Sequence, residues 1–327
     1  MLVDFAADVA ATPLEVEAAA VAAERAGYDG FAAAETRHDV FPALTLAARA
    51  TERITLQSAI AVAFARNPMS VAVLANDLQL ISAGRFQLGL GSQVQAHIER
   101  RFAMPWGRPA ARMEEFVRAV RAIWHAWATG DRLAFRGEFY RHTLMTDFFS
   151  PGVNPYGPPP ILIAAVGERM TQVAGRVGDG LLVHPLTSAA YLRERTRPAL
   201  AEARGGDLDG FSLGLSAMAV LGADEAARSR AEQAVKGQIA FYASTPAYRP
   251  VLELHGWGEL ADQLNSLSRR QAWAEMTALI TDEVLDTFAV TGDVSSAVKN
   301  RFGGLVDRIS LYTPYEVDPA LVRAALS

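Results

Sequence analysis

The sequence contains no cysteine, which excludes disulfide bonds, thiolate catalysis and sulfur-ligated metals. It has no run of about 18 apolar residues of the kind that crosses a bilayer. It also lacks any block of about five like charges, and its net charge of −5 argues against a nucleic-acid binder. We therefore expect neither a nucleic-acid partner nor a membrane partner.

The first residues do not combine a basic segment with an apolar one, so we expect no signal peptide and a cytoplasmic protein. The chain has 327 residues, of which 50% are hydrophobic and 20% are charged. A chain of this kind can bury a full core. Its length suits a barrel of ~250 residues that carries insertions, and we expect a single domain over residues 1–327.

Strand and helix signals alternate along the chain, which is typical of parallel βαβ units. The expected strands cover residues 2–7, 30–34, 54–64, 86–90, 161–165, 181–183, 211–221 and 306–311. Eight alternating units favour an α/β fold of the (β/α)8 TIM-barrel type over an open, doubly wound sheet.

Four other segments interrupt the alternation. Residues 93–108 are expected to form a loop, and residues 133–142 alternate like a hairpin. Residues 143–160 form a proline-rich excursion, and a helical stretch from about 224 to 288 is too long for one crossover. We expect insertions near 143–160 and 240–285.

In a barrel, functional groups lie at the carboxyl ends of the strands. One such end runs from Gly167 through Glu168, Arg169 and Met170 into a helix. The N–H groups of a helix N-terminus attract anions, so this turn is a candidate phosphate site. The alternative is an ordinary helix cap.

A second strand end, at Gly91, is followed by Ser92 and Gln93. Glycines there would let a flat ring approach the backbone, and Ser92 would hydrogen-bond it. The alternative is that these glycines end the strand for packing reasons. No Gly-Lys-Ser/Thr follows, so this is not a phosphate-binding P-loop.

The candidate proton-exchanging groups are His38 and His97, each on a loop beside charged residues. Either histidine could instead have only a surface role. Glu35 could orient a ring or a histidine, or could pair with a barrel arginine. His184, which follows the expected sixth strand, is a candidate for contact with substrate or cofactor. We find no third and fourth ligand beside His38 and Asp39, so we expect no metal.

Several segments in a shared order resemble the bacterial-luciferase-like superfamily. They are Thr-Glu-Arg-Ile-Thr-Leu at 51–56, Arg-Asn-Pro at 66–68, Ser-Ala-Gly-Arg-Phe-Gln-Leu-Gly-Leu-Gly at 82–91, Arg-Met-Glu-Glu at 112–115, Gly-Glu-Phe-Tyr at 137–140, Gly-Asp-Gly at 178–180 and Asp-Arg-Ile-Ser-Leu-Tyr at 307–312. The segment at 97–106 looks like an actinobacterial subgroup that uses the deazaflavin F420.

This resemblance implies a TIM barrel with F420, or alternatively FMN, across its carboxyl-terminal mouth. It implies a cis peptide at Ala59–Ile60 behind the ring, and it implies a homodimer. The implied cofactor contacts are Glu35, Ala59, Ile60, Ser92, Gln93, His97, Gly167, Glu168, Arg169 and Met170.

The chain also departs from the family pattern. Val94 and Thr187 stand where the sugar-phosphate-oxidising branch has a glutamate and a lysine, so glucose 6-phosphate is not the expected substrate. The family's second-strand histidine aligns with Thr36 or Arg37, which displaces His38 from that role.

The leading hypothesis is hydride transfer between C5 of F420 and a small organic substrate, with His38 or His97 exchanging the substrate proton. One alternative is an FMN-dependent monooxygenase. Another is a flavin- or F420-binding protein without catalysis. A metal-dependent hydrolase comes third.

Overall fold

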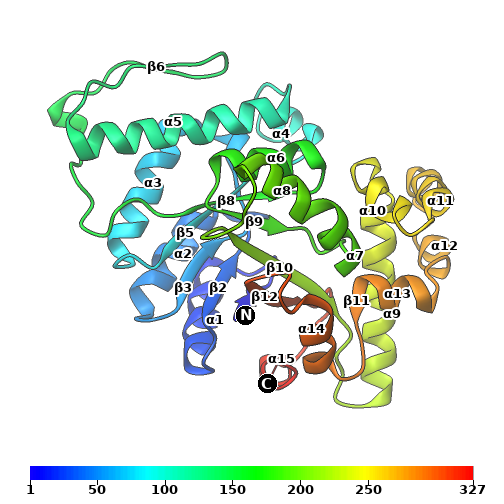
Figure 1. Cartoon of the computed structure of the whole chain (residues 1–327). Coiled ribbons are helices and arrows are strands. Elements are labelled where there is room, and N and C mark those ends of the chain that lie inside the picture. The colour runs from blue at the N-terminus through cyan, green and yellow to red at the C-terminus, as the bar shows by residue number, and fades with distance from the viewer. Residues whose placement is uncertain (327) are drawn as a thin grey trace.

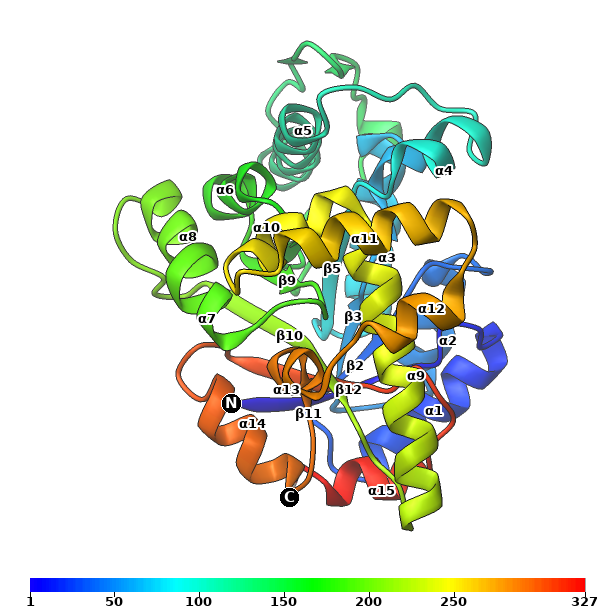
Figure 2. The ribbon, with the colours of Figure 1, turned by 90° about the vertical axis from the view of Figure 1, so that its right-hand side faces the viewer.

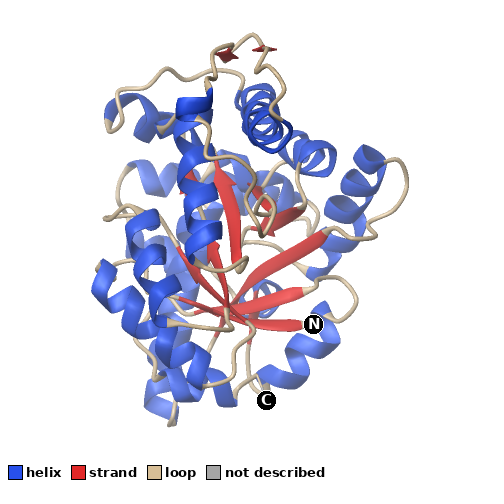
Figure 3. Cartoon of the chain, turned by 90° about the vertical axis from the view of Figure 1, so that its left-hand side faces the viewer, coloured by secondary structure: helices blue, strands red, loops and turns tan. Residues whose placement is uncertain are grey.

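The computed structural model describes residues 1–326 and has a closed barrel of parallel strands at its centre (Figure 3). The ring closes because β10 pairs with both β9 and β12, and β12 returns to β1. The barrel strands are β1 (Leu2–Ala6), β2 (Gly30–Ala33), β3 (Thr55–Ser58), β5 (Phe86–Gly91), β8 (Ile161–Ala165), β9 (Gly180–Val183), β10 (Ser212–Ala219) and β12 (Arg308–Tyr312). The expected TIM barrel is confirmed.

Helices surround this barrel and follow its strands in order (Figure 1). They are α1 (Pro13–Arg25), α2 (Val40–Ala50), α3 (Pro68–Ile81), α5 (Pro109–Thr129), α6 (Glu168–Val177), α7 (Ala189–Tyr191), α8 (Arg197–Arg204), α14 (Val294–Phe302) and α15 (Pro319–Ala324). Local sequence explains their ends. Thr12 and Glu15 form a capping box before α1, and Pro13 occupies its first turn.

The inside of the barrel carries polar pairs as well as apolar side chains. Near the amino ends of the strands, Arg308 donates to both carboxylate oxygens of Asp4, at 2.8 and 2.6 Å. Higher up, Gln57 donates to Gln87 at 3.0 Å. A bidentate pair satisfies most of the hydrogen-bonding groups of two buried charges.

The third strand differs from its expected form. Residues 54–64 do not make one strand, because the chain breaks at a cis peptide between Ala59 and Ile60. The short strand β4 (Ala61–Val62) then pairs with β5, and a single 3₁₀ turn follows over Ala63–Ala65. The cis bond expected from the family resemblance is confirmed.

A helical insertion stands between β10 and a two-residue strand, β11 (Ala289–Val290), that the sequence reading missed. Its helices are α9 (Glu225–Ala243), α10 (Arg249–Glu253), α11 (Gly258–Arg269), α12 (Trp273–Ala278) and α13 (Asp282–Phe288). In Figure 2 these helices face the viewer, in front of the barrel. Their buried side chains form a hydrophobic cluster with Met218 and Leu186 at the barrel wall.

Residues 93–108 are not a plain loop, because they contain the helix α4 (Gln95–Arg100). The expected hairpin forms as β6 (Phe135–Arg136) and β7 (Arg141–His142) and lies beyond α5 (Figure 1). The segment 143–160 contains a 3₁₀ turn over Asp147–Phe149. A single domain over 1–327 stays a prediction, and its last residue lies outside the described residues.

Candidate active site

Glu35, just after β2, holds the segment that follows the cis peptide. Its backbone N–H donates to the carbonyl of Ile60 at 3.0 Å. Its carboxylate Oε2 accepts from the backbone N–H of Val62 at 2.8 Å and from Arg66 Nη1 at 2.7 Å. This carboxylate is therefore occupied by bonds that fix the backbone, and the geometry favours a positioning role.

Arg66 links Glu35 to a second carboxylate. Its Nη2 donates to Asp39 Oδ2 at 2.6 Å, and only 13% of its side chain is exposed. Burial alone would lower the pKa of this guanidinium, but hydrogen bonds and charges from Glu35 and Asp39 raise it above its ordinary value. This is the pairing with a barrel arginine considered for Glu35 from sequence.

An open pocket of about 630 Å³, measured with its solvent-filled mouth, lies beside this ion-pair group. It is lined by Glu35, Arg37, His38, Asp39, Ala65, Arg66, Arg101 and Phe102. Arg101 reaches it from the end of α4 and donates to the carbonyl of Thr36 at 2.5 Å. The pocket is charged and faces solvent.

The two candidate histidines do not lie in one pocket. His38 is exposed and lines this pocket. His97 is exposed on α4, and none of the described residues makes a hydrogen bond to its ring. The structure thus leaves both histidine rings in water.

Ser92 and Gln93 lie at the carboxyl end of β5 with their polar groups turned to local backbone. Ser92 Oγ donates to the carbonyl of Gln93 at 3.1 Å. Gln93 has a positive φ of 60°, and its side chain accepts from the N–H of Val94 at 3.0 Å. Both residues are half-buried, so a ligand at the mouth would find them within reach.

Gly167 is the N-cap of α6, and no side chain caps this helix in the described chain. A Cβ built on Gly167 would meet nothing within 4 Å. Glu168 and Arg169 are exposed and Met170 is half-buried. The first turn of α6 therefore presents its N–H groups to open space, as an anion site requires.

His184, directly after β9, lies in an aromatic cluster that sequence reasoning missed. Its ring stacks on Tyr248 at 4.4 Å between centroids and meets Tyr242 edge-on at 4.5 Å. Tyr242 comes from α9 and donates to Tyr312, the last residue of β12, at 3.3 Å. Burial lowers the pKa of His184 to about 4 and raises that of Tyr248 to about 12.

The expected residues thus fall into three places around the barrel mouth. Glu35 and His38 share the open pocket, Ser92 and Gln93 end β5, and Gly167 to Met170 begin α6. Among residues 1–326, no group of three potential metal-binding side chains occurs. Within that same range, no helix is long and apolar enough to cross a bilayer.

The comparisons with known proteins identify the class. The luciferase-like monooxygenase family matches residues 4–307. An uncharacterized protein of Mycobacterium tuberculosis strain H37Rv is 53% identical over 297 residues, which cover 89% of this chain and 87% of the relative. A 5,10-methylenetetrahydromethanopterin reductase of Archaeoglobus fulgidus is 28% identical over 271 residues, covering 80% of this chain and 76% of the relative.

The fold has a matching solved structure. The coenzyme F420 dependent tetrahydromethanopterin reductase from Methanopyrus kandleri superposes with a TM-score of 0.79 and 19% identity, over 99% of this chain and 96% of that chain. Together these findings place the barrel among oxidoreductase-type enzymes. The chain belongs to the luciferase-like monooxygenase family.

Proposed function

We propose that the chain is an F420-dependent oxidoreductase that exchanges a hydride with a small organic substrate. The observation that carries this proposal is the uncapped first turn of α6, which opens at the carboxyl end of the barrel. Relatives in the same family whose names include F420 support the choice of cofactor. Bound F420 would supply the hydride at C5.

The residues present fit such a cofactor. Its phosphate would meet the N–H groups of Glu168, Arg169 and Met170 and the exposed Arg169 guanidinium, since Gly167 leaves the approach open. Its ring would lie toward Ser92 and the segment at Ala59–Ile60.

Glu35 is proposed to position the backbone behind the cofactor ring and to take no part in proton exchange. Because its carboxylate is bound by Arg66 and Val62 N–H, it would fix the wall behind the ring. His38 and His97 stay candidates for proton exchange. Both side chains are exposed, and no described residue orients either ring.

The decisive experiment compares the two cofactors. Purified protein is titrated with F420 and, separately, with FMN, and binding is followed by fluorescence quenching. Saturable F420 binding followed by hydride transfer to a ketone, aldehyde or enone panel is expected. Tight FMN binding without F420 binding would point to an FMN-dependent monooxygenase. F420 binding without transfer would point to a non-catalytic binding protein.

The anchor of the phosphate can be tested separately. Arg169→Ala should weaken F420 binding about tenfold, because one charge-assisted hydrogen bond to phosphate contributes about 1.5 kcal/mol or more. The control is Arg49→Ala, which removes an exposed arginine on α2. Equal affinities in the three proteins would contradict this phosphate site.

We also propose that two copies of the chain form a dimer through an apolar patch on α3 and the 143–160 segment. The patch consists of Val73, Leu74, Leu80, Ile81, Leu144, Phe148, Phe149, Val153 and Tyr156, all exposed. Asn154 joins the two elements by donating to Asn76. The patch exposes on the order of 1,000 Å², comparable with the ~800 Å² per partner of a stable interface.

Light scattering should therefore report a dimer. The double variant Phe148→Ser, Phe149→Ser should shift it to monomer, because it removes two of the largest exposed apolar side chains of the patch. Leu14→Ser removes an exposed apolar side chain on α1, outside the patch, and should leave the dimer intact. A monomeric unaltered protein would refute the proposal.

A further inference from the structure

The aromatic cluster around His184 faces the mouth of the barrel. A Cβ on Gly89 of β5 would strike Leu182 of β9 at 2.8 Å, although β8 separates these strands. Leu182 therefore points into the barrel. Because alternate residues of a strand share a face, His184 continues that inward face beyond the end of β9.

The same argument places Tyr312. A Cβ on Gly30 of β2 would strike Arg308 of β12 at 2.4 Å across the intervening β1, so Arg308 points inward. Tyr312 is four residues further along and shares that face. Both side chains thus stand at the carboxyl ends of their strands, on the side where a barrel places its chemistry.

The hydrogen bonds of His184 fix its tautomer. Nδ1 accepts from the backbone N–H of Leu186 at 3.1 Å, so the proton of the neutral ring must be on Nε2. Nε2 lies 3.0 Å from the hydroxyl oxygen of Tyr248 and donates to it. Because Tyr248 Oη accepts this bond, its own proton is left for another acceptor, and no described residue supplies one.

Burial keeps both partners in these states. A histidine with a pKa of about 4 stays neutral near pH 7, and a phenol with a pKa of about 12 keeps its proton. The rings stack at 29° with 4.4 Å between centroids, which restricts Tyr248 to one orientation. The exposed His38 and His97 have no such alignment.

We propose that Tyr248 is the catalytic proton donor to the substrate oxygen, and that His184 is the positioning residue that orients its hydroxyl. This inference rests on the proposed function and assigns its reaction class, the reduction of a carbonyl group by reduced deazaflavin. The insertion that carries Tyr248 is thereby part of the active site rather than a cover over it.

The step balances as follows. Bound reduced F420 would supply a hydride with its two electrons to the carbonyl carbon, and its oxidation would release one proton to water. The π electron pair of the C=O bond moves to oxygen, and that oxygen takes the phenolic proton of Tyr248. The hydrogen bond from His184 Nε2 stabilises the resulting phenolate. A proton from water restores the phenol, and the product is an alcohol.

The first test needs no cofactor. Nitrogen-15 spectra of the histidines in the ligand-free protein should show one neutral Nε2–H ring that does not titrate near pH 6, and His184→Gln should remove this signal. Tyr248→Phe keeps the ring stack but should shift the Nε2 resonance. The matched control is Tyr315→Phe, whose hydroxyl bonds only to backbone at Ala219 and Leu221 and should leave the signal unchanged.

The second test is an activity assay. The protein is mixed with reduced F420 as the hydride donor, and cyclohexanone or 2-cyclohexenone is the carbonyl probe. Tyr248→Phe should lower kcat about 100-fold, as expected for loss of a general acid, while the F420 dissociation constant stays unchanged. Tyr315→Phe should alter neither value. His184→Gln should lower kcat less than Tyr248→Phe, and the solvent deuterium isotope effect should shrink in Tyr248→Phe.

The outcomes separate the two proposals. If F420 does not bind, the proposed function falls and this inference falls with it. If F420 binds but no carbonyl probe is reduced, the carbonyl-reduction class is overturned. If F420 binds and a probe is reduced, but Tyr248→Phe keeps the original kcat and isotope effect, only the assignment of Tyr248 is overturned. A His184 that titrates near pH 6.5, without response to Tyr248→Phe, overturns the positioning role.

Discussion

The two sides of the barrel mouth place titratable side chains in opposite environments. On the side of β2 and β3, Glu35, Arg66 and Asp39 form an ion-pair group beside an open pocket. On the side of β9 and β12, His184 lies among tyrosines under the helical insertion. One side pairs its charges next to water, whereas partial burial on the other side favours the neutral forms of His184 and Tyr248.

The histidines show what this difference means. His38 stands in the open pocket and is hydrated, but His184 is surrounded by aromatic rings and loses hydration when charged. Desolvation lowers the pKa of His184 to about 4. Residue type alone therefore does not decide which histidine can align a proton, because the surrounding residues do.

The largest expected loss of stability comes from a substitution in β5, whose new side chain would clash with strands on both sides of the barrel. In Gly89→Ala, the new Cβ would lie 1.8 Å from the carbonyl oxygen of Ser58 on β3 and 2.8 Å from Leu182 on β9. Since backbone must move, we expect a loss of about 3 kcal/mol or more in the free energy of unfolding. Urea denaturation measures it.

The matched control is Gly167→Ala, whose Cβ meets nothing within 4 Å and whose φ is −94°. It should change the free energy of unfolding by less than about 0.5 kcal/mol. Similar losses in the two variants would show that steric fit at Gly89 does not hold the two sides together.

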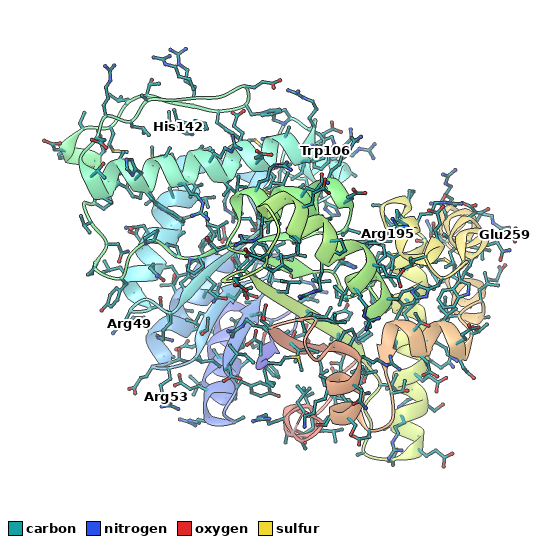
Figure 4. The ribbon with its side chains drawn as sticks, viewed as in Figure 1. Arg49, Arg53, Trp106, His142, Arg195 and Glu259 are labelled. Atoms are coloured by element: carbon teal, nitrogen blue, oxygen red, sulfur yellow. The ribbon has the colours of Figure 1, made fainter. Side chains whose placement is uncertain are left out.

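A second variant breaks only the charged side. Arg66→Met leaves the carboxylate of Glu35, 7% exposed, without its cation, and we expect a loss of about 3 kcal/mol in the free energy of unfolding. Arg49→Met is the control, because Arg49 is exposed at the outer edge of the molecule (Figure 4). Equal stabilities of the two variants would mean that the pair contributes little.

A third measurement follows the free energy of unfolding against pH and tests the burial of His184. His184 has a pKa of about 4 when folded and about 6.5 when unfolded, so the unfolded chain binds more protons between these values. Its contribution is complete above pH ~6.5 and is lost as the pH falls toward ~4, by about 3 kcal/mol in total.

Comparing the unfolding free energies of the unaltered protein and His184→Gln across this range isolates that loss. The variant should show a flatter dependence on pH. His97→Ala, which removes an exposed histidine, should follow the unaltered protein. Parallel curves for all three would rule out a desolvated His184.

Much of the fold could be predicted from the sequence, because strand and helix signals are local. The expected strand at 161–165 matches β8, and the expected strand at 86–90 nearly matches β5. The break at Ala59–Ile60 was expected only from the family resemblance, not from residue periodicity. The helix α4 was missed because it is short and polar.

The candidate site could be predicted only in part. Strand ends gave Glu35, Ser92 and Gly167, since the rule for barrels selects positions along the chain. Tyr248 had no such signal, because it is 64 residues from His184 and belongs to no strand end. Periodicity also could not show that Arg66 would occupy the carboxylate of Glu35.

By itself the sequence determined the barrel, its order of strands and the turn at Gly167, because these follow from hydrophobic spacing and glycine placement. Only the tertiary structure decided which charges are paired and which histidine has its pKa lowered by burial. Hydration and pairing depend on neighbours distant in the chain, and those neighbours exist only once the insertion and the barrel mouth have come together.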